Sequence, residues 1–149
     1  QTIDKNAAWL SEQLNSIGIT VYQQRTIGDH KLQMFESLDN AFMNSDIVIM
    51  TGGLGPTKDD FTKNAITEYF GLELKTNEEI LHSVKNYLHQ KGRQLTEVNK
   101  KQAEVPAGSI TFENKMGTAP GIWIEQEEKI LIALPGVPYE MRDLMRYSG

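Results

Sequence analysis

The chain has 149 residues, of which 39% are hydrophobic and 23% charged, and its formal net charge is −5. This composition excludes a disordered chain, and the net negative charge argues against sequence-independent binding of nucleic acid. The absence of cysteine excludes disulfides and thiolate chemistry, and no apolar run approaches the ~20 residues that cross a bilayer. We therefore expect one cytoplasmic domain over residues 1–149, with neither nucleic acid nor a membrane as partner.

Apolar periodicity predicts the N-terminal elements. Apolar residues recur at spacings of four and three over residues 3–17, which indicates an amphipathic helix. Residues 19–27 are typical of a strand, and Asp29 stands at the N-cap position of a second helix. The continuous apolar run at residues 46–51 predicts a strand buried on both faces, as in a parallel sheet.

The second half of the chain continues the alternation. Two strands at 122–125 and 129–134 flank a polar turn, which predicts a hairpin. Helical patterns occupy residues 59–70, a stretch from a capping box at Thr76–Glu79 to about Gly92, residues 96–104, and the segment from Pro138 onward.

Alternating helices and strands predict an α/β domain, a three-layer α/β/α sandwich with a mostly parallel sheet. The chain begins with a helix, although the opening strand of a doubly wound sheet commonly lies at its centre. We therefore expect a further strand before Gln1, which this sequence lacks.

A glycine-rich loop follows the apolar strand at 46–51 and precedes a helix. Glycines allow the backbone to approach an anion, and a helix N-terminus adds partial positive charge. A tight turn without a ligand is the alternative, but three glycines within four positions exceed what a turn needs, so we favour binding. The loop is not a P-loop, because Lys58 is preceded by Thr57 and followed by Asp59, and it is not a dinucleotide fingerprint, because position 58 is lysine and not glycine. Its candidate ligand-binding residues are Gly52, Gly53, Leu54, Gly55, Pro56 and Thr57.

Acidic residues stand beside this loop. Asp59 and Asp60 could simply complement the helix dipole, or they could hold a divalent cation against a bound phosphate, and the sequence leaves both interpretations open. Asp29 has the same ambiguity, because it caps a helix yet follows a predicted strand at the same sheet edge. Lys58 is the cation nearest to the loop in sequence.

Two further loops fall at the ends of predicted elements. Each alone is weak evidence, since glycine and proline punctuate any fold. Together with the first loop they suggest one long cleft. Their candidate binding residues are Gly117, Thr118, Pro120 and Gly121 in the first, and Pro135, Gly136 and Pro138 in the second.

The segment Thr51–Thr62, with these loops, resembles the N-terminal domain of the CinA family, within the molybdopterin-binding superfamily of MogA, MoaB and MoeA. Asp4 and Asn6 match a family motif near the first helix, although Lys5 replaces its threonine. Further matches are Gly28-Asp29, Asn99, Lys101, Gln102, Ala103, Pro106, Asn114, Glu140 and Met141.

The resemblance implies a MogA-like sandwich and a divalent metal, Mg²⁺, Mn²⁺ or Co²⁺. It implies catalysis by Asp29 and Asp60. From the residues beside the loop, Asp60 could hold the metal with Asp29 or Asp59, and Lys58 could offset developing charge. It adds Asp4, Asn6 and Asn114 to the substrate-binding residues. The family's strand ending in Gly-Asp-Glu-Leu-Leu and its C-terminal amidase domain have no counterpart in this sequence.

Three functions remain open at this point. The first is metal-dependent hydrolysis of ADP-ribose or a related adenosine dinucleotide. The second is a module, or an adenylyltransferase-like enzyme, that binds molybdopterin or a nucleotide without pyrophosphatase activity. The third is a domain that mainly assembles a larger chain, and we expect a homodimer or homotrimer.

Overall fold

The structure is a computed structural model that describes residues 5–28, 30–52, 54 and 61–147. None of the helices in these ranges is long and apolar enough to cross a membrane. The helices are α1 (Lys5–Ser16), α2 (Lys31–Asn44), α3 (Phe61–Tyr69), α4 (Glu78–Gln90), α5 (Glu97–Lys100), the 3-10 turn η2 (Lys101–Ala103) and α6 (Pro138–Tyr147). The strands are β1 (Ile47–Thr51), β2 (Leu74–Thr76), β3 (Glu104–Pro106), β4 (Ile110–Phe112), β5 (Gly121–Gln126) and β6 (Lys129–Leu134).

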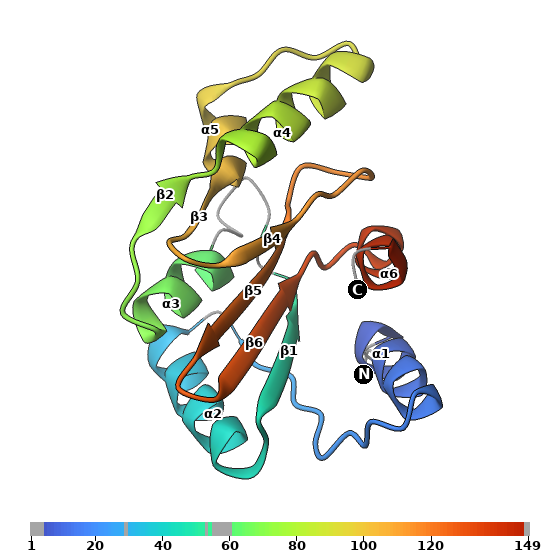
Figure 1. Ribbon diagram of the computed structural model, residues 1–149, viewed down its shortest axis with the longest axis vertical. Coiled ribbons are helices and arrows are strands. Elements are labelled where there is room, and N and C mark those ends of the chain that lie inside the picture. The colour runs from blue at the N-terminus through green and yellow to red at the C-terminus, as the bar shows by residue number, and fades with distance from the viewer. Residues whose placement is uncertain (1–4, 29, 53, 55–60, 148–149) are drawn as a thin grey trace.

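The main sheet of the described residues has the strand order β1-β6-β5-β4 (Figure 1). Strand β1 runs parallel to β6, whereas the pairs β6-β5 and β5-β4 are antiparallel. The α/β class is confirmed, but the expected mostly parallel sheet is mixed in the part of the chain that the structure describes. The reason is local, because short connections reverse the chain and cannot join parallel strands.

The predicted hairpin at β5 and β6 is confirmed. Gln126 pairs with Lys129, so Glu127 and Glu128 alone form the turn between the strands. Both glutamates have positive φ, 50° and 66°. Left-handed backbone at two successive positions is the geometry of a type I′ turn, whose twist matches that of paired strands.

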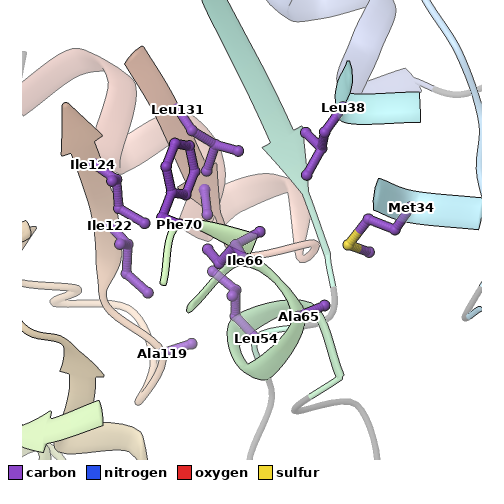
Figure 2. Close-up of a cluster of buried hydrophobic side chains, with 11 residues drawn as sticks. Met34, Leu38, Leu54, Ala65, Ile66, Phe70, Ala119, Ile122, Ile124 and Leu131 are labelled. Atoms are coloured by element: carbon purple, nitrogen blue, oxygen red, sulfur yellow. The ribbon is translucent and has the colours of Figure 1, made fainter. Parts of the chain in front are cut away.

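Helices cover both faces of the sheet, which gives the predicted three layers (Figure 1). On β1, Val48 and Met50 pack with α2 and α3, whereas Ile49 packs with α1 and α6. This alternation follows from the two-residue period of a strand. Figure 2 shows the larger cluster, which includes Ile66 of α3 and Leu131 of β6, and both of these side chains are fully buried.

Strand β1 is less buried than its apolar sequence predicts. Ile47 is exposed and the other four residues are half-buried, although both faces of the strand carry packed side chains. Among the described strands β1 pairs with β6 alone, so it lies at the edge of this sheet. The edge position, which sequence pattern does not reveal, explains the remaining exposure.

The expected strand at 19–27 is wrong for the structure described here. These residues form no strand, and most of them are exposed, including Tyr22. Alternating apolar residues supply one face, but a strand also needs a hydrogen-bonded neighbour. The N-cap prediction is corrected as well: the His30 side chain caps α2 by accepting from the N–H of Gln33 at 3.4 Å, and Asp29 lies outside the described residues.

A small second unit packs beyond the sheet, at the top of Figure 1. Its core joins α4 to η2 through Ile80, Val84, Leu88 and Ala103. The sequence missed the two short strands β2 and β3 that pair beside it. It also placed the cap of α4 one residue early, because Thr76 belongs to β2 and the side chain of Asn77 accepts from the N–H of Ile80 at 3.1 Å.

Candidate functional site

Three loops meet at one end of the main sheet, where β1 and β6 end and β5 begins. Parallel pairing aligns Thr51, the last residue of β1, with Leu134, the last residue of β6. Antiparallel pairing brings the start of β5 to the same end, with Ile122 opposite Ala133. The segments that follow β1 and β6 and the segment that precedes β5 are therefore neighbours.

These segments line one cavity of about 470 Å³. Of the sequence-predicted residues, the structure brings Gly52, Leu54, Gly117, Thr118, Pro135 and Gly136 to it. Ligand binding by these residues stays a prediction. The other lining residues are Tyr87, Leu88, Arg93, Asn99, Met116, Ala119, Val137, Tyr139 and Glu140.

Two of the loops touch through glycines. A Cβ on Gly136 would lie 3.0 Å from the Cα of Gly52, which is tighter than most Cβ contacts in proteins, so one of the two backbones would have to shift. Gly52 has φ +93°, and its N–H donates to the carbonyl oxygen of Leu134 at 3.0 Å. That N–H is therefore already used within the protein. The role of Gly52 is therefore to let the loop at Gly136 pack closely against it. Any N–H group that binds an anion must come from another residue.

Asn114 organises the loop before β5. Its Nδ2 donates to the carbonyl oxygen of Ala119 at 2.8 Å and to Glu140 Oε1 at 2.6 Å. Its Oδ1 accepts from the N–H of Met116 at 2.9 Å. Both backbone bonds fix the orientation of the amide, so the Nδ2 donor always faces Glu140. Asn114 thus supports a cavity residue without lining the cavity itself.

Glu140 is the acidic residue in the described lining of the cavity. It lies in the first turn of α6 and is only 8% exposed. Burial raises the pKa of its carboxyl above the ordinary value of 4.5, and the hydrogen bond from Asn114 lowers the pKa in part. Gly117 is packed against this carboxyl: a Cβ at that position would collide with Oε1 and lie 2.6 Å from Cδ.

Arg93 is the cation in the described lining of the cavity. Its side chain is exposed and forms no ion pair with any residue that the structure describes. It follows the C-terminus of α4, where its backbone N–H donates to the carbonyl oxygen of Leu88 at 2.8 Å. Sequence reasoning missed Arg93 and Tyr87, because nothing near them in the chain marks a loop at a strand end.

Other predicted residues lie near the cavity without lining it. Asn6 of α1 donates from Nδ2 to the carbonyl oxygen of Gly136 at 2.8 Å, while its buried Oδ1 has no partner among the described residues. A Cβ on Gly121 would lie 3.2 Å from Phe112, so packing alone accounts for that glycine. Pro138 begins α6, and Pro120 precedes β5.

The remaining predicted residues lie outside the described part of the chain. They include every residue expected to be catalytic or to bind metal, namely Asp29, Lys58, Asp59 and Asp60. The others were expected to bind substrate: Asp4, Gly53, Gly55, Pro56 and Thr57. Within the described residues, no three histidine or acidic side chains gather as a metal site would require.

Comparison with known proteins places this geometry in context. Residues 1–148 match the family described as "Probable molybdopterin binding domain". A protein of Caldicellulosiruptor saccharolyticus, named as competence-damage inducible, is 49% identical over 144 residues, which are 97% of this chain and 35% of that protein. The chain therefore spans about a third of the length of this curated relative.

Solved structures agree on the fold. The crystal structure of a CinA protein of unknown function from Thermoplasma acidophilum is 34% identical, with a TM-score of 0.86, over 97% of this chain and 85% of that chain. A tungsten cofactor synthesizing protein MoaB from Pyrococcus furiosus is 21% identical with a TM-score of 0.55, over 95% of this chain and 76% of that chain. At that identity the likeness shows the fold alone.

Proposed function

This chain belongs to the molybdopterin-binding domain family, and we propose that its cavity binds an adenosine compound with a phosphoanhydride and hydrolyses it, as an ADP-ribose pyrophosphatase would. The observation that carries the proposal is the meeting of three loops in one cavity, at the ends of β1 and β6 and at the start of β5. Ligands of open α/β sheets bind at such strand ends. We also propose that the activity lies in the cytoplasm, with which a chain free of cysteine is compatible.

Arg93 supports an anionic ligand. A guanidinium presents a fork of donors that matches phosphate oxygens in pairs. In a chain of net charge −5, an arginine at the cavity with no acidic partner among the described residues is available for such a contact. Lys58, which lies outside the described residues, would add a second cation.

The reaction needs only water as co-substrate. Its oxygen attacks one phosphorus of the anhydride and the P–O bond to the bridging oxygen breaks. AMP and ribose 5-phosphate leave as monoester dianions, and the two protons of the water are released. Arg93 would bind the charge on the phosphoryl oxygens and hold the anhydride in line for attack.

Asp60, with Asp29 or Asp59, would hold the divalent metal. When bound, the metal would supply neutralisation of the phosphate charge. Magnesium sites commonly use one or two carboxylates together with substrate oxygens, so a cluster of three protein ligands is not required. Glu140, as a carboxylate on the cavity wall, is compatible with such a site, but Asn114 already occupies its Oε1.

The test is AMP formation from ADP-ribose, measured by chromatography with and without Mg²⁺, Mn²⁺ or Co²⁺. We expect turnover only with metal, and its loss in Asp60→Asn. The matched control is Asp143→Asn, which removes one charge from α6 away from the cavity lining. Full activity in Asp60→Asn, or none in folded wild-type protein with any of the three metals, overturns the proposal.

A second candidate is a binding module that retains a pterin without transforming it. The apolar side chains at the cavity, among them Met116 and Tyr139, favour it because they suit a flat ring. Pterins fluoresce, so an emission spectrum of freshly purified protein tests this function. Light scattering on the same sample tests the proposed homodimer or homotrimer.

A further inference from the structure

Three exposed apolar side chains gather at the cavity. Met116 is 45% exposed, Val137 40% and Tyr139 60%, and all three line it. Single exposed apolar residues need no explanation, but a group at one cavity is typical of a ligand-binding surface. Met116 lies in the loop before β5, Val137 in the loop after β6, and Tyr139 in the first turn of α6, so the fold brings them together. We call them the apolar rim.

Glu140 adjoins the apolar rim. It follows Tyr139 directly in the chain, lines the same cavity, and is almost fully buried. Its Oε1 accepts from Asn114, whereas its Oε2 has no partner in the part of the chain that the structure describes. Oε2 is not completely enclosed by protein, so a donor on a ligand in the cavity can reach it and replace water there.

The surroundings hold this carboxyl in one place. Asn114 is itself held by two backbone bonds, to Met116 and to Ala119. Gly117 leaves the space that the carboxyl occupies, since any side chain there would displace it. Interactions fixed on both sides position a polar group well for recognition.

We propose that the apolar rim and Glu140 form a subsite for a planar nitrogen heterocycle that carries an amino group. The rim contacts the face of the ring, and Glu140 Oε2 accepts from its N–H. Adenine and pterins share this chemistry, so the subsite would take either. For adenine, the inference rests on the proposed function, with the anhydride directed to Arg93.

A purely structural role for Glu140 makes a different prediction. As an acid in the first turn of α6 and an acceptor for Asn114, it would stabilise the fold and affect all ligands equally. If Glu140 instead recognises the ring of the ligand, its substitution changes the affinity of each ligand according to the hydrogen-bonding groups on that ring. The two roles are therefore separated by comparing ligands that differ only in that edge.

Glu140→Gln gives the sharpest comparison. Because Asn114 Nδ2 is a fixed donor, the oxygen of the introduced amide must face it, and the amide NH₂ then faces the ligand. That NH₂ group cannot hydrogen-bond to the amino group of adenine, because both are donors. It can donate to the carbonyl oxygen of hypoxanthine. The substitution should therefore reverse the preference between these two bases.

The experiment is calorimetric titration of the intact protein with ADP-ribose, its hypoxanthine analogue and 6-hydroxymethylpterin. We expect wild-type protein to prefer ADP-ribose over the analogue by about tenfold, and Glu140→Gln to lose or reverse this preference. Pterin binding should weaken about tenfold in the same variant. Asp143→Asn, on the same helix, should change neither. Tyr139→Ala, at an exposed position, should weaken all three ligands equally.

The outcomes separate the two proposals. Nucleotide binding without base preference, or equal losses for all ligands in Glu140→Gln, overturns the subsite while leaving the pyrophosphatase proposal intact. Pterin binding that depends on Glu140, without any nucleotide binding, supports the subsite and overturns the pyrophosphatase proposal. No binding of any of the three overturns both. If Glu140→Gln fails to fold, an unequal effect of Tyr139→Ala on the two bases overturns the subsite.

Discussion

Asn114 and Glu140, 26 residues apart in the chain, are joined by a hydrogen bond of 2.6 Å between Nδ2 and Oε1. The bond joins the loop before β5 to the first turn of α6. In the chain, these two segments precede and follow the hairpin β5-β6. It therefore fixes one wall of the cavity from two directions. Substitutions at this contact and at the neighbouring glycine contacts probe whether the cavity's shape or its chemistry determines function.

Gly136→Ala should destabilise the protein by about 1–3 kcal/mol. The added Cβ would lie 3.0 Å from the Cα of Gly52, and backbone cannot move aside as a flexible side chain can. Urea denaturation measures the effect. The matched control is Gly28→Ala, whose Cβ would meet only Gln33 Oε1 at 3.9 Å. Equal stability of the two variants would show that the loops separate easily.

Gly117→Ala should alter ligand recognition more than stability. Its Cβ would strike the carboxyl of Glu140, which lies at the end of a flexible side chain and can turn away. We expect a loss of about 1 kcal/mol in unfolding free energy, because the carboxyl and Asn114 Nδ2, which would lie 3.1 Å from the added Cβ, must both adjust. Titration with ADP-ribose and its hypoxanthine analogue should show reduced base preference. An unchanged preference would mean that the position of the carboxyl does not matter.

Glu140 should make stability depend on pH. Burial raises its pKa in the folded protein above the ordinary 4.5, so the folded state binds the proton more tightly than the unfolded state. Stability from this group is then fully present below pH 4.5 and falls as pH rises through the raised pKa. Denaturation of wild type and Glu140→Gln across this window tests the sign. A wild-type protein that gains stability relative to the variant on raising pH would contradict it.

Arg93→Gln should weaken nucleotide binding by about tenfold and leave stability unchanged. The guanidinium is exposed and has no ion-pair partner among the described residues, so folding does not depend on it. A charge-assisted hydrogen bond to phosphate contributes about 1.5–3 kcal/mol. Arg25→Gln, also exposed but outside the cavity lining, is the control. Equal affinity of the two variants would remove Arg93 from the phosphate site.

Sequence patterns predicted the elements whose bounds depend on residues close together in the chain. The bounds of β6 follow from an apolar run beside a polar turn, and the structure reproduces them. The strand expected at 19–27 failed because pairing depends on a distant neighbour. The mostly parallel sheet failed because the hairpin and β4, whose pairing the sequence did not reveal, contribute two antiparallel pairs.

The candidate site likewise contains residues that sequence patterns predicted and residues that only the fold reveals. Glycine and proline loops marked the edge of the sheet, and the structure brings Gly52, Gly117 and Gly136 together there. Arg93 could not be found from sequence, because packing of the α4 unit carries it to the cavity. The role of Glu140 also needed the fold, since a first-turn acid is usually solvated and this one is buried against Asn114.

The turn at Glu127-Glu128 shows where this chain could be improved. Two residues other than glycine occupy left-handed backbone there, at a cost of about 1 kcal/mol each. The turn therefore reduces the stability of the hairpin, and the pairing of β5 with β6 must offset this conformational cost. Asn-Gly at these positions would remove that cost far from the cavity. The engineered turn should speed refolding if the hairpin forms in the transition state, and slow unfolding if it forms later.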